Sequence, residues 1–267
     1  MSSWWHAVEV ATSTFWSSGR YDAVGDRIAP IAEQVVVAAC RRHPVAAAAV
    51  VDLACGTGSA ALAASHRGAD VTGVDFTAEL LAIAARRPGA QAVRWHTGDA
   101  ADTGLPSGAF DVAVSNMGII FVEPDRQVAE IVRLLKPTGV LAFSSWVRSA
   151  SNPFFDPVVT VLGPPPATGF SPEQWGDAHI LTERLAPHFD DIVIHTGAHR
   201  WEFASMTAAL HFLQAESPVH VATFARADVS QRQLLIAEFE AALGQHVEAS
   251  GVVAFDAPYL VVSALRA

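Results

Sequence analysis

The chain has 267 residues, a formal net charge of −10, 51% hydrophobic residues and 16% charged ones. We therefore expect one large domain, or a core with a small cap, that buries a sizeable apolar interior. The negative charge argues against a DNA or RNA backbone as the main partner, no apolar run reaches the roughly 20 residues of a membrane span, and the first residues show no export signal. These exclusions favour a cytoplasmic monomer or homodimer that acts on a small, partly apolar molecule.

Strand-like and helix-like segments alternate through the middle of the chain, which is typical of an α/β protein with a parallel sheet. A first helix is predicted over 22–42, because apolar residues recur there at helical spacing. The strands predicted after it are 48–53, 70–74, 92–96, 110–115 and 140–144. The helices predicted between them are 58–67, 77–87 and a segment that carries Val128, Ile131, Val132 and Leu135.

The alternation is less regular after the strand at 140–144. Residues 149–178 are rich in proline and predict a long functional loop or lid without regular structure. Further strands are predicted at 191–195 and 259–265, and further helices at 205–216 and 230–243. Ser230 and Gln233 have the spacing of a capping box, which would open the last of these helices.

A glycine turn, Gly56-Thr57-Gly58, follows the predicted strand 48–53. Glycine lets a ligand approach the backbone closely, and the start of the next helix offers unpaired N–H groups. Asp75 ends the following apolar run, where a carboxylate can accept hydrogen bonds from both hydroxyls of a ribose. Together these features predict a cofactor that contains a nucleoside.

Two kinds of cofactor fit this turn. Residues 56–61 formally satisfy a dinucleotide fingerprint with alanine in the third place, which would indicate an NAD(P)-dependent oxidoreductase. Asp52 favours S-adenosylmethionine instead, because a carboxylate there would repel a pyrophosphate but attract an amino group or a sulfonium. Asp99 follows the third predicted strand, where its carboxylate could accept from the adenine amino group. The oxidoreductase stays open as an alternative, as does a binding protein that keeps the fold without turnover.

The order of motifs resembles that of the class I S-adenosylmethionine-dependent methyltransferases, and more closely the group that contains the ubiquinone/menaquinone-biosynthesis methyltransferases. The motifs are Val51 to Gly58, Val71 to Asp75, Gly98 to Ala100, Leu105 to Asp111 and Leu135 to Gly139. The resemblance implies a Rossmann-like, seven-stranded sheet that is mostly parallel, with an antiparallel last strand and helices on both faces. One departure is Thr138, where the family usually has glycine.

The resemblance also implies which residues bind S-adenosylmethionine and its product S-adenosylhomocysteine. They are Tyr21, Asp52, Ala54, Gly56, Gly58, Asp75, Phe76, Asp99, Ala100 and Ser115. Asp52 would face the amino group, Asp75 would hold the ribose hydroxyls, and Tyr21 would reach the carboxylate of the methionine part. Asp99 would contact the adenine edge.

The methyl acceptor has no motif of its own. The residues that we expect to line its pocket are Trp4, Trp5, Asn116, Trp146 and Trp175, although most aromatic residues in such segments simply bury area. An in-line displacement needs mainly alignment and desolvation, and an oxygen acceptor, which is slightly favoured, would also benefit from a base. The candidates for that base, by location alone, are His6, His179 and His211.

A single methyltransferase domain is predicted for the whole chain. Its core would comprise 22–148, 180–197 and 228–267, and its lid and acceptor-site segments would comprise 1–21, 149–179 and 198–227. No metal site is expected, because Cys40 and Cys55 lack ligand spacing and His195 and His199 lack a third ligand.

Overall fold

A computed structural model describes residues 13–164 and 169–267, so Trp4, Trp5 and His6 lie outside the described residues. Contacts divide the chain into two compact units. The sheet unit comprises Gly25–Val147, Phe170–Gly197 and Pro258–Ala267, and the helical unit comprises the described parts of Met1–Val24, Arg148–Gly169 and Ala198–Ala257. This division differs from the predicted core and lid, because residues 22–24, 148 and 228–257 belong to the helical unit and residues 170–179 to the sheet unit.

The sheet has seven strands in the order β3-β2-β1-β4-β5-β7-β6. The strands are β1 (Ala49–Leu53), β2 (Asp70–Asp75), β3 (Val93–Thr97), β4 (Phe110–Asn116), β5 (Leu135–Trp146), β6 (Phe189–Phe203) and β7 (Val253–Arg266). The first five pair in parallel, and β7 is antiparallel to β5. The predicted fold class is therefore confirmed, including the antiparallel strand inserted near the end of the sheet.

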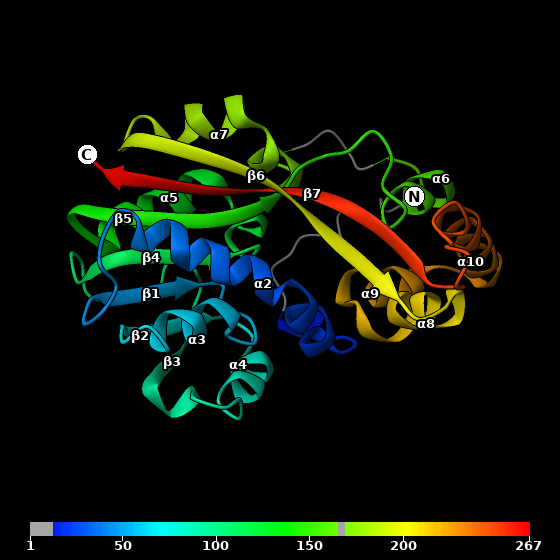
Figure 1. The fold of residues 1–267 in the computed structure, drawn as a ribbon, viewed down its shortest axis with the longest axis horizontal. Helices are drawn as coiled ribbons and strands as arrows, with labels where there is room; N and C mark the ends of the chain where they lie inside the picture. The colour runs from blue at the N-terminus through cyan, green and yellow to red at the C-terminus, as the bar shows by residue number, and fades with distance from the viewer. Residues whose placement is uncertain (1–12, 165–168) are drawn as a thin grey trace. The chain divides into compact units, whose positions relative to one another are not determined.

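The parallel strands are short apolar runs, because helices cover both faces of a parallel sheet. Val50 and Val51 are successive residues of β1, so their side chains point to opposite faces, and both are fully buried. The helices with residues in this unit are α2 (Tyr21–Cys40), α3 (Ser59–Ser65), α4 (Ala78–Ala84), α5 (Pro124–Leu134) and α7 (Ala178–Leu185), with the short turns η2 (Ala90–Ala92), η3 (Ile119–Phe121) and η4 (Pro172–Gly176). Figure 1 shows β1, β4 and β5 side by side among these helices.

The helical unit is built from short helices and from the parts of β6 and β7 that belong to it, 198–203 and 253–257 (Figure 1). They are α1 (Ser13–Trp16), α6 (Asp156–Leu162), α8 (Met206–His211), the π-helical turn η5 (Phe212–Glu216), α9 (Pro218–Arg226) and α10 (Val229–Gly244). Its interior is aromatic: the ring of Phe154 lies 4.9 Å from Phe255 and 5.2 Å from Trp201, centroid to centroid. His220 is buried beside Phe154, and its Nε2 lies 2.9 Å from the Phe154 carbonyl oxygen.

Two predictions about local structure were wrong. Residues 149–178 are not a structureless loop, because α6 and η4 lie within them and a proline stands in the first turn of each, where its missing N–H costs nothing. The capping box of α10 is formed by Asp228 and Gln231 rather than by Ser230 and Gln233. The helix begins one residue earlier than predicted, and Asp228 accepts from the backbone N–H of Gln231 at 2.8 Å.

None of the helices within the described residues is long and apolar enough to cross a membrane.

Candidate cofactor site

The order of the strands makes the carboxyl ends of β1 and β4 the expected place of a ligand crevice. The connection after β1 leads to β2 on one side, whereas β4 lies on the other side of β1. Ligands of open α/β sheets bind at such a switch point, where the loops that leave two neighbouring strands diverge. The glycine turn, Asp52 and Ser115 all lie at or next to these strand ends.

The loops after β1 and β4 are in close contact and carry strained backbone. Ala54 and Met117 both have positive φ angles, 51° and 57°, which residues with a Cβ rarely adopt. A Cβ on Gly118 would lie 2.4 Å from the Ala54 carbonyl oxygen, so glycine is required there. The Ser115 hydroxyl joins the two strand ends, since it donates to the Leu53 carbonyl at 2.7 Å. Strain of this kind concentrates where a protein shapes a ligand site.

Asp52 is the most unusual polar group of the crevice. Its side chain is 1% exposed, and Oδ2 accepts from the Ala61 N–H at 2.8 Å. Oδ1 is buried without a hydrogen-bond partner. Burial raises the pKa of Asp52 to about 8; the Ala61 N–H opposes this shift, and the nearby charge of Asp75 adds to it. A buried acceptor without a partner is costly, so Asp52 is poised to receive a donor, above all a cationic one.

Asp75 ends β2 and is held by two backbone groups. Oδ2 accepts from the Gly56 N–H and Oδ1 from the Thr77 N–H, both at 2.8 Å. Burial raises the pKa of Asp75, and these two hydrogen bonds act in the opposite direction. Each carboxylate oxygen has two acceptor sites, so both retain capacity for a diol. Phe76, which is half-buried, follows directly.

Position 58 requires glycine both for its backbone conformation and because a neighbouring indole fills the space that a side chain would take. Its φ is +80°, and a Cβ on Gly58 would lie 2.4 Å from Cη2 of Trp95 on β3. The motif predicts a glycine here for close approach of a ligand. In the structure the space beside its Cα is taken by Trp95, while Gly56, with φ 54°, uses its N–H to bind Asp75.

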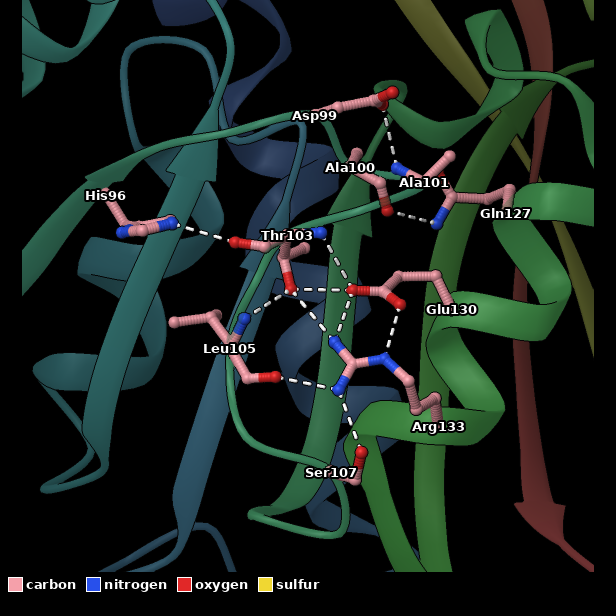
Figure 2. A network of polar contacts seen from close by, with 10 residues as sticks. All are labelled: His96, Asp99, Ala100, Ala101, Thr103, Leu105, Ser107, Gln127, Glu130 and Arg133. Carbon is pink, nitrogen blue, oxygen red and sulfur yellow. Dashed lines mark hydrogen bonds and ion pairs between the residues drawn. The ribbon is translucent and has the colours of Figure 1, made fainter.

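Asp99 and Ala100 lie in the loop that follows β3. Asp99 is exposed (51%); Oδ1 accepts from the Ala101 N–H at 2.9 Å, and Oδ2 lies 3.2 Å from Nη2 of Arg126. Ala100 is buried, and its carbonyl accepts from Nε2 of Gln127 on α5 at 3.1 Å (Figure 2). A ligand that binds Asp99 must therefore share its carboxylate with Arg126 or displace Arg126 from it.

A polar network fixes the rest of this loop to α5 (Figure 2). Oε1 of Glu130 accepts from the backbone N–H of Thr103 at 2.8 Å and from its hydroxyl at 2.6 Å. Arg133 binds Glu130 and donates to the Leu105 carbonyl at 2.7 Å. Burial alone would raise the pKa of Glu130, but the hydrogen bonds from Arg133 and Thr103 lower it to about 2. The loop that carries Asp99 is thus anchored by an ionised, buried glutamate.

Three of the residues predicted to line an acceptor pocket are described by the structure, and each has a structural partner in the sheet unit. Oδ1 of Asn116 accepts from the Ser144 hydroxyl at 2.8 Å, and the ring of Trp146 lies edge-on to Tyr259 at 6.5 Å. Trp175 is 0% exposed and packs edge-on against Phe143 at 5.4 Å. These contacts explain all three side chains by packing, and their role in a pocket stays a prediction.

The two proposed bases that the structure describes, His179 and His211, lie on helix surfaces. His179 on α7 is 80% exposed, 3.5 Å from Glu183, and His211 on α8 is 66% exposed. Solvated positions like these do not favour the histidines as bases for a desolvated reaction. Tyr21 is the first residue of α2 and contacts Trp16 edge-on at 5.9 Å; its contact with a cofactor stays a prediction.

Sequence reasoning missed two side chains beside the glycine turn, Trp95 and Arg87. Trp95 pairs with Gly73 in the register of β2 and β3, and Arg87 donates to the Thr57 carbonyl at 3.1 Å. Neither relationship has a local signal, because each joins positions on different elements of the chain.

Neither thiol nor metal chemistry is indicated in the part of the chain that the structure describes. It contains no group of three His, Cys, Asp or Glu residues that could hold a metal ion. Burial raises the pKa of the Cys55 thiol well above its usual value, and the charges of Asp52 and Asp75 reinforce this effect. Cys55 is therefore a neutral thiol rather than a nucleophile.

The strand order, the strained turn after β1 and the acidic residues at the ends of β1 and β2 are those of the class I methyltransferase fold. Residues 51–143 match the family described as a methyltransferase domain. The predicted resemblance to the class I S-adenosylmethionine-dependent methyltransferases is confirmed over these residues, and S-adenosylmethionine is the cofactor of that family.

Relatives support this assignment over parts of their length. The chain is 39% identical over 97 residues to a demethylmenaquinone methyltransferase of Thermus thermophilus, covering 34% of this chain and 44% of that protein. It is 30% identical over 153 residues to an uncharacterized protein of Mycobacterium tuberculosis, covering 56% of this chain and 54% of that one. The alignments thus span about half the length of these relatives.

A solved structure has the same fold. Phosphoethanolamine N-methyltransferase 2 of Haemonchus contortus, in complex with phosphomonomethylethanolamine and S-adenosylhomocysteine, superposes with a TM-score of 0.53 at 19% identity. The match covers 87% of this chain and 52% of that one. At this identity the likeness concerns the fold alone.

Proposed function

We propose that this protein transfers the methyl group of S-adenosylmethionine to a small, partly apolar acceptor by in-line displacement, with oxygen slightly favoured as the accepting atom. The observation that carries the proposal is the buried Oδ1 of Asp52, which lacks a partner at the end of β1. An amino group with a positive charge is the complement of that oxygen. A pyrophosphate would be repelled by Asp52, once ionised, and by Asp75.

We propose that the residues named by the motif resemblance contact the cofactor along its length. Asp52 would receive the amino group, Asp75 the ribose hydroxyls and Asp99 the adenine amino group, with Ala54, Gly56, Gly58, Phe76, Ala100 and Ser115 shaping the crevice and Tyr21 facing the carboxylate. The bound sulfonium supplies a methyl group that is already activated for transfer. The remaining tasks of the protein are to align the acceptor and to exclude water.

Calorimetric titration tests the choice of cofactor. S-adenosylhomocysteine should bind, and NAD(H) and NADP(H) should not. Tight binding of a nicotinamide cofactor alone would favour the oxidoreductase and overturn the proposal.

A screen of candidate acceptors with labelled S-adenosylmethionine tests turnover. Product formation is expected with small phenols, hydroxylated molecules or quinone precursors, and the name of the Thermus relative, demethylmenaquinone methyltransferase, supports including the last class. Binding without turnover on any acceptor would favour the second alternative, a binding protein that keeps the fold.

The proposal also covers the location, the oligomeric state and the partners of the protein. We place the protein in the cytoplasm as a monomer or homodimer, acting as a single methyltransferase domain without a nucleic-acid partner. The net charge of −10 supports this view.

A further inference from the structure

Arg87, three residues after the end of α4, joins three parts of the sheet unit. Its Nη1 lies 3.1 Å from the Thr57 carbonyl oxygen and 3.3 Å from Oγ of Ser59, the first residue of α3. Its Nη2 lies 2.9 Å from Oδ1 of Asp26 on α2. One half-buried guanidinium thus binds the glycine turn, the start of the following helix and a neighbouring helix at once.

The turn needs such a contact because its backbone loses much conformational entropy when it becomes ordered. Gly56 and Gly58 flank Thr57 with positive φ angles of 54° and 80°, and glycine has more conformations to lose than any other residue. The Thr57 carbonyl points to a cation rather than to another backbone N–H, which makes this hydrogen bond charge-assisted. Only the planar fork of arginine can reach the turn and Asp26 together.

We propose that Arg87 is a positioning residue for the cofactor, which holds the Gly56–Gly58 turn in the conformation that binds it. The inference rests on the proposed function, since it concerns the same site. Without Arg87 only a fraction of molecules would have the turn in place, and the apparent dissociation constant rises by the reciprocal of that fraction.

The experiment compares the wild type with Arg87→Gln and Arg87→Lys. By calorimetry, Arg87→Gln should bind S-adenosylhomocysteine on the order of tenfold more weakly, as expected from losing one charge-assisted hydrogen bond. Arg87→Lys keeps the charge beside Asp26 but lacks the fork, and should lose less. In the ligand-free protein, hydrogen exchange of the backbone amides of residues 55–60 should be on the order of tenfold faster in Arg87→Gln than in the wild type.

Arg94→Gln is the matched control. It breaks the exposed ion pair with Asp70 in the same sheet and should change neither the affinity nor the exchange of the turn. A lower melting temperature for Arg87→Gln, with unchanged exchange at 55–60 and unchanged affinity, would mean a merely structural role and overturn the inference. If the wild type binds no S-adenosylhomocysteine, the proposed function fails, and the exchange measurement still decides whether Arg87 orders the turn.

Discussion

The indole ring of Trp95 occupies the place where a side chain on Gly58 would lie, with Cη2 only 2.4 Å from an ideal Cβ at that position. Trp95 reaches Gly58 from β3, two strands away from the strand that precedes the turn. It also covers Gly73, its partner on β2, whose Cβ would lie 2.7 Å from Cζ3 of the same ring. The cofactor turn therefore packs against an aromatic side chain, and this side chain leaves room only for glycine at positions 58 and 73.

Gly58→Ala should lower the free energy of unfolding by roughly 2–4 kcal/mol, from overpacking against Trp95 and from a positive φ at alanine. Denaturant unfolding measures this change. In a Trp95→Leu background the same substitution should cost only the strained φ, roughly 1–2 kcal/mol. Equal costs in the two backgrounds would show that the indole is not the cause.

Binding of S-adenosylhomocysteine should release a proton near pH 7. Free Asp52 is mostly protonated there, because burial raises its pKa to about 8, and a bound ammonium favours the carboxylate. Affinity should therefore rise as the pH increases toward 8. Calorimetry in two buffers of different ionisation enthalpy counts the protons.

Asp52→Asn tests the origin of that proton. It should abolish most of the release and weaken binding by roughly 10–100-fold, as for a lost hydrogen bond to a charged group. Asp111→Asn is the matched control, because Asp111 is already ionised at neutral pH and has no proton to release. Partial burial acts to raise the pKa of Asp111, but Lys136 and the Ala49 N–H hold it below its usual value. Proton release that persists in Asp52→Asn would contradict the assignment.

Glu130→Gln should destabilise the protein most at neutral pH. The pKa of Glu130 is lowered from 4.5 to about 2 in the folded protein, so its stabilisation is full above pH 4.5 and is lost as the pH falls toward 2. A shift of this size corresponds to about 3 kcal/mol. Urea unfolding from pH 2 to 7 should show the wild-type and Glu130→Gln curves converging at the acidic end.

Glu240→Gln on α10 serves as the comparison for Glu130, because its side chain is exposed and such substitutions change stability little. A constant gap between wild type and Glu130→Gln across the pH range would contradict the role of the ionised carboxylate in the loop network.

Thr138→Gly should stabilise the protein, unlike most substitutions to glycine. Thr138 is exposed near the start of β5, in Lys136-Pro137-Thr138-Gly139, with φ +61°, a conformation that costs a residue with a Cβ about 1–2 kcal/mol. Part of this gain is offset by the greater freedom of glycine in the unfolded chain, so we expect about 1 kcal/mol by thermal unfolding. Thr138→Ala keeps the Cβ and should gain less; an equal gain would rule out relief of backbone strain.

Strong local patterns made half of the fold predictable. β1 to β4 and the helices between them were expected within a few residues, because each is a short apolar run or an amphipathic stretch bounded by glycine or proline. The segments α6, α7 and α9 were missed because each is short, and α6 lies in the stretch 149–178, where prolines suggested a loop. In α6 and α9 the proline stands in the first turn, where it starts a helix instead of breaking one.

The sequence by itself determined the resemblance to a methyltransferase family, because its motifs occur in a fixed order along the chain and each is encoded within a few neighbouring residues. Only the tertiary structure decided what surrounds those motifs. Trp95 meets Gly58, Arg87 meets Thr57 and Gly118 meets Ala54 through strand order and register, which bring together positions far apart in sequence. The burial of the unpartnered Asp52 oxygen likewise arises only in the folded protein, since burial is a property of the whole fold and not of the motif.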